Sequence, residues 1–143
     1  MKENNFISAS GWFSLALPKD WVEYESEEEG TYAFFNSKSW TGNLRITPLR
    51  SSNSEDNMAL SVSRSTLKEH QGAREMQLGE LMAVSYKTYT KDAERLLMYF
   101  WMAGKMNYVF TCSFTIDKAI DGSRKGNKEL KLVEGIISSI RIL

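Results

Sequence analysis

The chain has 143 residues, of which 42% are hydrophobic and 25% charged, a composition typical of a globular protein long enough for one domain with its own core. Eighteen basic and eighteen acidic residues give a net charge of zero, which argues against a general nucleic-acid binder, because such proteins need surplus cations to neutralise phosphates. One cysteine and one histidine are too few for an internal disulfide or a tetrahedral zinc site.

The N-terminal residues are polar and predict no signal peptide. The longest apolar run, residues 96–103, is far shorter than the roughly 20 residues that a membrane helix needs. We therefore expect a cytoplasmic protein without a membrane partner, folded as one domain over residues 1–143. The oligomeric state is left open.

Short stretches of alternating apolar side chains occupy the first fifty residues. Residues 6–8 and 12–17 predict two strands, and the second should end at Pro18, which cannot donate a ladder hydrogen bond. Further strands are expected at residues 21–24, 31–36 and 43–50. Residues 37–42 have the composition of a loop.

A helix is predicted to begin near Ser52, because Ser52 and Glu55 have the spacing of a capping box. Glu55 and Asp56 would then lie in its first turn, and Gly72 would follow its last turn. Its apolar stripe is modest, so we expect a partly exposed helix on one face of a sheet.

Three apolar runs follow a short extended segment at residues 74–78. They occupy residues 81–89, 95–103 and 108–116, and polar breaks at residues 90–94 and 104–107 suit hairpin connections. The pattern predicts a three-stranded antiparallel meander. Its middle run is apolar on both faces, so it needs cover on both sides.

A loop at residues 117–126 precedes a second helix, which Asn127 is expected to cap. Apolar residues recur at helical spacing from Leu130 to Ile140, and residues 140–143 predict a final strand. The whole order predicts an α+β fold, with a mainly antiparallel sheet of about six strands and helices packed on both faces, an α/β/α sandwich.

Both ends of this pattern resemble the PsbP-like superfamily. The resemblance rests on Phe13 and Ser14, on the turn from Pro18 to Trp21, and on the closing run of residues 136–140. That superfamily includes an extrinsic protein of photosystem II and a nuclear-import factor that binds a small GTPase. The resemblance implies an antiparallel sheet between helices and a protein-binding or accessory role. No functional residue of these members matches a position in this chain.

Candidate catalytic residues are few. His70 could act as a general base, but its position at a helix end favours a surface residue that completes the helix terminus. Cys112 could be a nucleophile, but its place between Phe110 and Phe114 favours a buried core thiol. An enzyme would need carboxylates such as Glu75, Glu80 or Asp92 to converge in the fold.

Two segments are candidates for binding a partner. An acidic run contains Asp20, Glu23, Glu25, Glu27, Glu28 and Glu29 and ends at Gly30; it lacks the order of a calcium loop, so it is either a solvated loop or a patch for a basic partner. Trp40 lies in a predicted loop, where an exposed tryptophan would be a strong binding residue and a folded-back one would only pack.

Basic residues near the C-terminus predict no phosphate site. They are interleaved with acidic residues, so the local sum of charges is near zero, and Gly122 to Gly126 lacks the order of a phosphate-binding loop. The basic set is Lys118, Arg124, Lys125, Lys128 and Lys131.

These patterns together favour a non-catalytic protein-binding domain, which uses Trp40 and the acidic residues Glu23, Glu25, Glu27, Glu28 and Glu29 and needs no cofactor or metal. A bacterial immunity or antitoxin-type protein that blocks a basic partner is one concrete version. The alternative is a carrier of a small apolar ligand, held in a pocket between sheet and helix.

Overall fold

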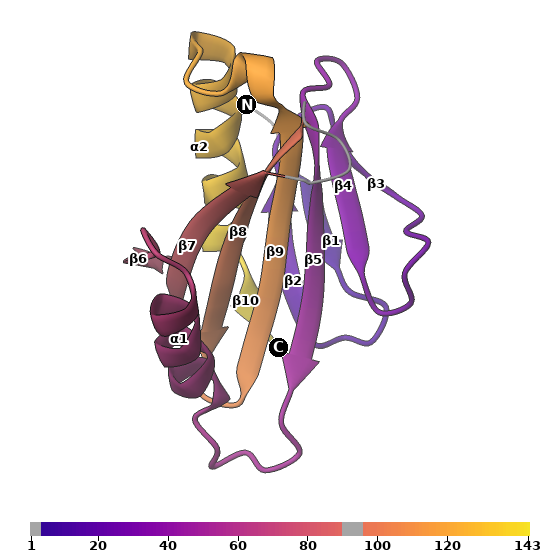
Figure 1. Ribbon diagram of the computed structural model, residues 1–143. Coiled ribbons are helices and arrows are strands. Elements are labelled where there is room, and N and C mark those ends of the chain that lie inside the picture. The colour runs from indigo at the N-terminus through magenta and orange to yellow at the C-terminus, as the bar shows by residue number, and fades with distance from the viewer. Residues whose placement is uncertain (1–3, 90–95) are drawn as a thin grey trace.

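A computed structural model describes residues 4–89 and 96–143, which form two antiparallel sheets and two α-helices (Figure 1). In chain order the elements are β1 (Asn4–Ile7), β2 (Phe13–Leu17), β3 (Trp21–Tyr24), β4 (Tyr32–Asn36), β5 (Gly42–Arg50), α1 (Met58–Glu69), β6 (Arg74–Leu78), β7 (Leu81–Tyr89), β8 (Leu96–Lys105), β9 (Tyr108–Asp117), the 3-10 helix η1 (Lys118–Ile120), α2 (Arg124–Ser138) and β10 (Arg141–Ile142).

Within these residues the main sheet has seven strands, in the order β3-β4-β5-β9-β8-β7-β6, and each neighbouring pair is antiparallel. The strands β1, β2 and β10 form a second, three-stranded sheet. The predicted α+β class with antiparallel strands is confirmed. The number of strands differs from the expected six or so, because the chain builds two sheets instead of one.

Alternating side chains give the main sheet one largely buried face. Along β9 every second residue from Phe110 to Ile116 is buried, whereas the hydroxyl side chains between them are only half-buried. Cross-strand partners of these residues, such as Leu44, Ile46 and Trp101, are buried on the same side. We call this side of the sheet the inner face and the opposite side the outer face.

Aromatic rings join the second sheet to the inner face. Phe13 of β2 meets Phe110 of β9 edge-on, with ring centroids 5.1 Å apart, and meets Tyr32 of β4 at 5.5 Å. Phe6 of β1 meets Phe34 of β4 at 5.1 Å in the same manner. Such edge-to-face pairs add about 0.5–1.5 kcal/mol each to the free energy of burial. They hold the second sheet over the β4, β5 and β9 part of the main sheet.

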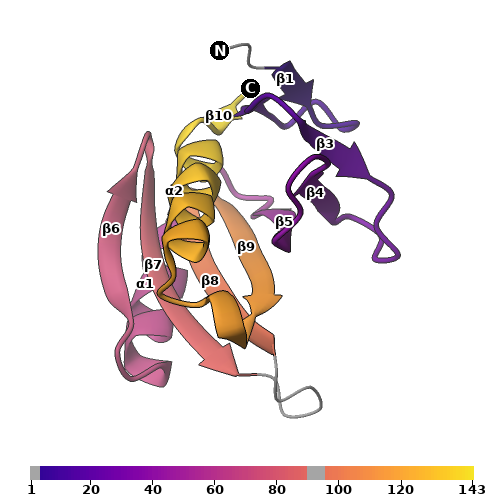
Figure 2. The ribbon, with the colours of Figure 1, turned by 90° about the horizontal axis from the view of Figure 1, so that it is seen from above.

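The two helices contact opposite faces of β8. Trp101 contacts α2 and Gly104 contacts α1, and residues three positions apart on a strand point to opposite sides of the sheet. Trp101 donates its indole N–H to Glu134 of α2 at 3.1 Å. Gly104 lies so close to α1 that a Cβ at this position would stand 2.8 Å from the Ala59 Cβ. Figure 2 shows α2 along the inner face beside the second sheet, with α1 behind the main sheet.

The cover of the main sheet is therefore less symmetrical than the predicted sandwich. On the inner face, α2 shares the surface with three additional strands. On the outer face, α1 contacts β6, β7, β8 and β9, and Figure 1 shows it at one end of the sheet. No helix among the described residues is long and apolar enough to cross a membrane.

Both helices begin at residues other than those predicted. Helix α1 begins at Met58, capped by Asn57, whose side chain accepts a hydrogen bond from the Leu60 amide at 3.1 Å; the predicted start at Ser52 is wrong. Helix α2 is capped by Ser123, which accepts from the Gly126 amide at 3.0 Å, and not by Asn127.

The meander forms as predicted, with a longer middle strand. β8 runs on to Lys105, and Met106 and Asn107 make the turn to β9, with Met106 at a positive φ of 53°. Gly104, expected in the break, lies inside β8 and is buried. The predicted break at residues 90–94 lies outside the described residues. Trp12 is half-buried beneath the guanidinium of Arg50, which lies 4.1 Å from the Trp12 ring centroid.

Candidate binding surfaces

The loop between β4 and β5, residues 37–41, presents Trp40 to solvent. The Asn36 side-chain oxygen accepts hydrogen bonds from the backbone amides of Lys38 at 3.1 Å and Ser39 at 3.0 Å, which fixes the start of the loop. The Trp40 indole N–H donates to the Asn43 side chain at 3.0 Å, and 62% of Trp40 remains exposed. The ring is thus tethered at its polar end while its apolar surface stays open.

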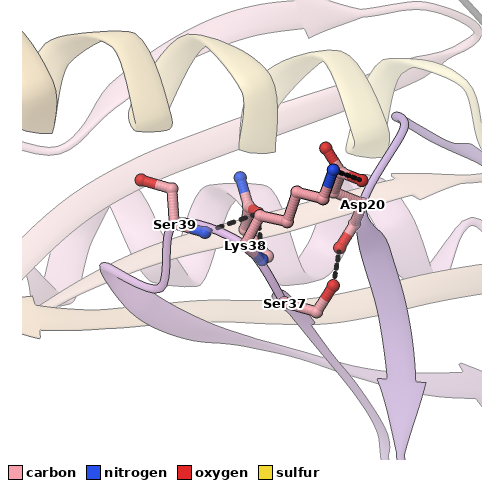
Figure 3. Close-up of polar contacts among 5 residues, drawn as sticks. Asp20, Ser37, Lys38 and Ser39 are labelled. Carbon is pink, nitrogen blue, oxygen red and sulfur yellow. Dashed lines mark hydrogen bonds and ion pairs between the residues drawn. The ribbon is translucent and has the colours of Figure 1, made fainter.

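The turn between β2 and β3, which contains Asp20, holds this loop through hydrogen bonds (Figure 3). The Asp20 carbonyl, in a residue with a positive φ of 74°, accepts from the Ser37 hydroxyl at 2.7 Å and from the Ser37 amide at 2.8 Å. The Lys38 ammonium lies 3.8 Å from the Asp20 carboxylate, an exposed pair that contributes little to stability. The backbone hydrogen bonds hold the loop in place, so little ordering would be needed on binding.

The acidic residues lie at the other end of the same hairpin. β3 and β4 pair from Trp21 opposite Asn36 to Tyr24 opposite Ala33, and the chain reverses through residues 25–31. Three residue steps, roughly 10 Å at about 3.3 Å each, separate the two ends. The five exposed glutamates are Glu23, Glu25, Glu27, Glu28 and Glu29, and among the described residues they form no ion pair. The structure does not bring them together with Trp40.

The outer face beyond α1 carries partly exposed aromatic and hydroxyl side chains. Tyr24 and Phe35 stack edge-on at 5.5 Å between ring centroids, and Val22 beside them is 40% exposed. Farther along lie half-buried threonine and serine residues and the exposed Arg45, which forms no ion pair among the described residues. Asn43, which holds the Trp40 ring, is on this same face, so Trp40 stands at its edge.

A pocket of about 340 Å³ opens on the inner face, between α2 and the strands β6, β7 and β8. Its lining includes Tyr99 and Trp101 from β8, Leu130 and Glu134 from α2, and Arg74 from β6. Its volume falls within the usual range for small-ligand sites, about 300–1,000 Å³. The sequence offered an apolar pocket between sheet and helix only as the alternative and named none of its residues, since Arg74 and Glu134 lie sixty positions apart in the chain.

The candidate catalytic residues that the structure describes do not converge. His70 stacks on Tyr86, with ring centroids 3.7 Å apart, beyond the end of α1. Cys112 is fully buried, and burial raises the pKa of its thiol. Glu75 lies on β6 and Glu80 in the following turn, both exposed, whereas Asp92 lies outside the described residues. No three His, Cys, Asp or Glu side chains of the described ranges are placed to hold a metal ion.

Solved structures with a similar fold come from bacteria and yeast. A protein of Bacteroides thetaiotaomicron VPI-5482 is 31% identical, with a TM-score of 0.78 over 100% of this chain, which spans 49% of that one. The Saccharomyces cerevisiae Ran-binding protein Mog1p has a TM-score of 0.60 at 9% identity, over 99% of this chain and 96% of its own.

Cyanobacterial PsbP from Synechocystis sp. PCC 6803 has a TM-score of 0.59 at 9% identity, over 99% of this chain and 92% of its own. At such identities the likeness to PsbP and Mog1p shows the fold alone, and it confirms the PsbP-like fold predicted from the sequence. Comparison with curated proteins gave no match. A family model described as a domain of unknown function, DUF3805, matches residues 1–143.

Proposed function

Because the chain belongs to the DUF3805 family, whose description names no activity, we propose its function from its own surfaces: it is a non-catalytic protein-binding domain. The outer face of the main sheet is the binding surface, and Trp40 is its anchor. The observation that carries this proposal is the Trp40 side chain, 62% exposed yet fixed by its hydrogen bond to Asn43.

An exposed and already ordered tryptophan suits a binding role. Tryptophan is enriched among the residues that dominate binding energy, and a side chain held in place before binding loses little entropy on association. The Tyr24 and Phe35 pair extends the apolar surface on the same face. The fold supports the proposal by analogy, since Mog1p is named as a Ran-binding protein.

The proposed partner is a protein surface with an apolar patch and a carboxylate. The apolar patch would cover Trp40, Tyr24 and Phe35, while the carboxylate would meet Arg45, whose guanidinium is exposed and has no ion-pair partner among the described residues. The narrower prediction of an immunity protein finds no support among the related structures.

The acidic residues are proposed to act separately from Trp40. Because the loop at residues 25–30 lies at the far end of the hairpin from Trp40 and directly after Tyr24, its charges lie at the rim of the binding surface, where they steer a basic region of the partner. Such charges change the association rate and its salt dependence more than the lifetime of the complex.

Affinity capture from the source cell tests the proposal. The chain and its Trp40→Ala variant are immobilised, and proteins bound at low salt are quantified by mass spectrometry. We expect a protein that the parent enriches and the variant loses by tenfold or so, since anchor residues contribute roughly 2 kcal/mol or more. The control is the Ile7→Ala variant, which truncates an exposed apolar side chain on β1 of the second sheet and should retain that protein.

The acidic residues are tested with the same partner. Replacement of Glu27, Glu28 and Glu29 with Gln should slow association at low salt and leave dissociation unchanged. The parent and this variant should have equal melting temperatures, because the three side chains are exposed.

Equal capture of all proteins by the parent and by Trp40→Ala, or no protein captured specifically by the parent, would disprove the proposed binding surface.

A further inference from the structure

The pocket on the inner face has an aromatic floor. Tyr99 and Trp101 lie side by side on β8, with ring centroids 6.2 Å apart and planes inclined by only 23°. Leu130 of α2 adds an apolar side chain to the wall. Trp101 is buried, whereas Tyr99 and Leu130 are half-buried, so these two side chains offer the surface for a flat hydrophobic group of the size of one aromatic ring.

Hydrogen bonds fix this floor before any ligand arrives. The Trp101 indole N–H is bonded to Glu134, and the Tyr99 hydroxyl donates to the Asp121 carboxylate. Burial, and then the bond to Asp121, raises the pKa of Tyr99, which keeps the phenol neutral. Lys87 also pairs with Asp121 at 3.5 Å, so the charge of Lys87 is already balanced.

Two opposite charges on the pocket wall remain unpaired. Among the described residues, neither Arg74 on β6 nor Glu134 on α2 forms an ion pair, although both line the pocket. Within the described ranges, Glu134 is half-buried and accepts a hydrogen bond from the neutral Trp101 donor but pairs with no cation, while Arg74 is exposed and pairs with no anion. A ligand that satisfies both groups must carry a carboxylate for Arg74 and an ammonium for Glu134.

We propose that this pocket binds a zwitterionic aromatic molecule of the amino-acid class, with its ring against the half-buried Tyr99 and Leu130, next to the buried Trp101, and its charged groups between Arg74 and Glu134. The site lies on the inner face, across the sheet from the surface proposed for the protein partner, and the two proposals stand independently. The pocket thus differs from the apolar carrier site that the sequence offered as the alternative function.

Three matched compounds test the ligand chemistry. L-Phenylalanine carries both charged groups, 3-phenylpropanoate lacks the ammonium, and phenethylamine lacks the carboxylate. Each is titrated into the isotope-labelled chain, while the resonance of the Trp101 indole N–H and the heat of binding are followed. We expect L-phenylalanine to bind most tightly and to shift the Trp101 resonance.

Two charge-removing variants assign the contacts. Arg74→Gln should weaken L-phenylalanine binding by roughly tenfold or more and leave phenethylamine unaffected. Glu134→Gln retains an acceptor for Trp101 and should weaken L-phenylalanine and phenethylamine equally. The controls Arg64→Gln and Glu80→Gln change exposed charges outside the pocket and should change nothing.

Two results would refute the proposal, and a third measurement controls for loss of fold. No shift of the Trp101 resonance at millimolar concentration of all three compounds would show that the pocket is not such a site. Binding of 3-phenylpropanoate or phenethylamine as tight as that of L-phenylalanine would disprove a zwitterionic ligand. Thermal unfolding of Arg74→Gln and Glu134→Gln at the parent temperature would show that any loss of binding is not a loss of fold.

Discussion

Glu129 of α2 is a buried carboxyl group, with 5% of its surface exposed and its Oε2 atom without a hydrogen-bond partner among the described residues. Burial raises its pKa above the ordinary value, and a hydrogen bond from Asn36 and the charge of Lys125 offset this only in part. The folded state therefore favours the protonated form of Glu129 more than the unfolded chain does.

The stability of the protein should consequently depend on pH through Glu129. When the pKa of a carboxyl group rises on folding, the group stabilises the folded state fully at any pH below its pKa in the unfolded chain. This contribution is lost as the pH rises through its pKa in the folded state. The change in the free energy of unfolding caused by Glu129→Gln should thus be more stabilising, or less destabilising, at neutral pH than at a pH near 4.5, the ordinary pKa of a glutamate.

Urea unfolding at several pH values measures this difference. The exposed Glu80→Gln variant is the control and should show no such trend. An effect of Glu129→Gln on the free energy of unfolding that is the same at acidic and neutral pH would contradict the proposed role of burial.

Trp40 shows where prediction from the sequence ends at this scale. Loop composition indicated a connection at residues 37–42, but it could not distinguish an exposed ring from one folded onto the domain. That difference depends on one hydrogen bond to Asn43, three residues further along. Cys112 was easier, because alternation with Phe110 and Phe114 already predicted its burial.

Helix α1 shows a competition between local hydrogen bonds at the scale of elements. The expected capping box at Ser52 does not form, because nearby side chains make hydrogen bonds within the loop instead, one to a backbone amide and one to another side chain. Asn53 accepts from the Glu55 amide at 3.0 Å, and the Ser51 hydroxyl donates to Asp56 at 2.6 Å. Several residues here can cap a helix, and the sequence alone does not rank them.

Substitution of the two competing caps tests the helix start. Asn57→Ala should lower the free energy of unfolding by about 1 kcal/mol, because the Leu60 amide loses its acceptor. Ser52→Ala should have almost no effect, since Ser52 is exposed and precedes the helix. Chemical denaturation of both variants measures the two values, and a larger loss for Ser52→Ala would contradict the observed cap.

The charges of α2 could not be assigned from their order in the chain. Basic and acidic residues alternate along the helix, which predicted a neutral surface. In the structure Glu129 is buried and Glu134 is bonded to Trp101, whereas Arg124, Lys128 and Lys131 are exposed. The exposed side of α2 therefore carries more positive charge than the net charge of all its residues indicates.

The division of the strands into two sheets is a property of the whole molecule. Alternation of apolar residues identified most strands, because it is a local pattern, but the pairing of strands from the two chain ends depends on residues far apart in the sequence. β10 pairs with β2, the Leu143 amide donates to the Trp12 carbonyl at 2.9 Å, and the Ala16 amide donates to Ser139 at 2.8 Å. These contacts join residues more than a hundred positions apart, and periodicity carries no information about them.

The outer face should become protected when the protein partner binds, and hydroxyl-radical footprinting measures this directly. The chain is oxidised alone and in complex with the protein recovered by affinity capture, and oxidation of each side chain is compared. We predict that Trp40, Tyr24 and Phe35 are protected in the complex, whereas the exposed Tyr89 and Met106 react equally in both states. Unchanged oxidation of Trp40 in a complex that protects other residues would contradict the proposed binding surface.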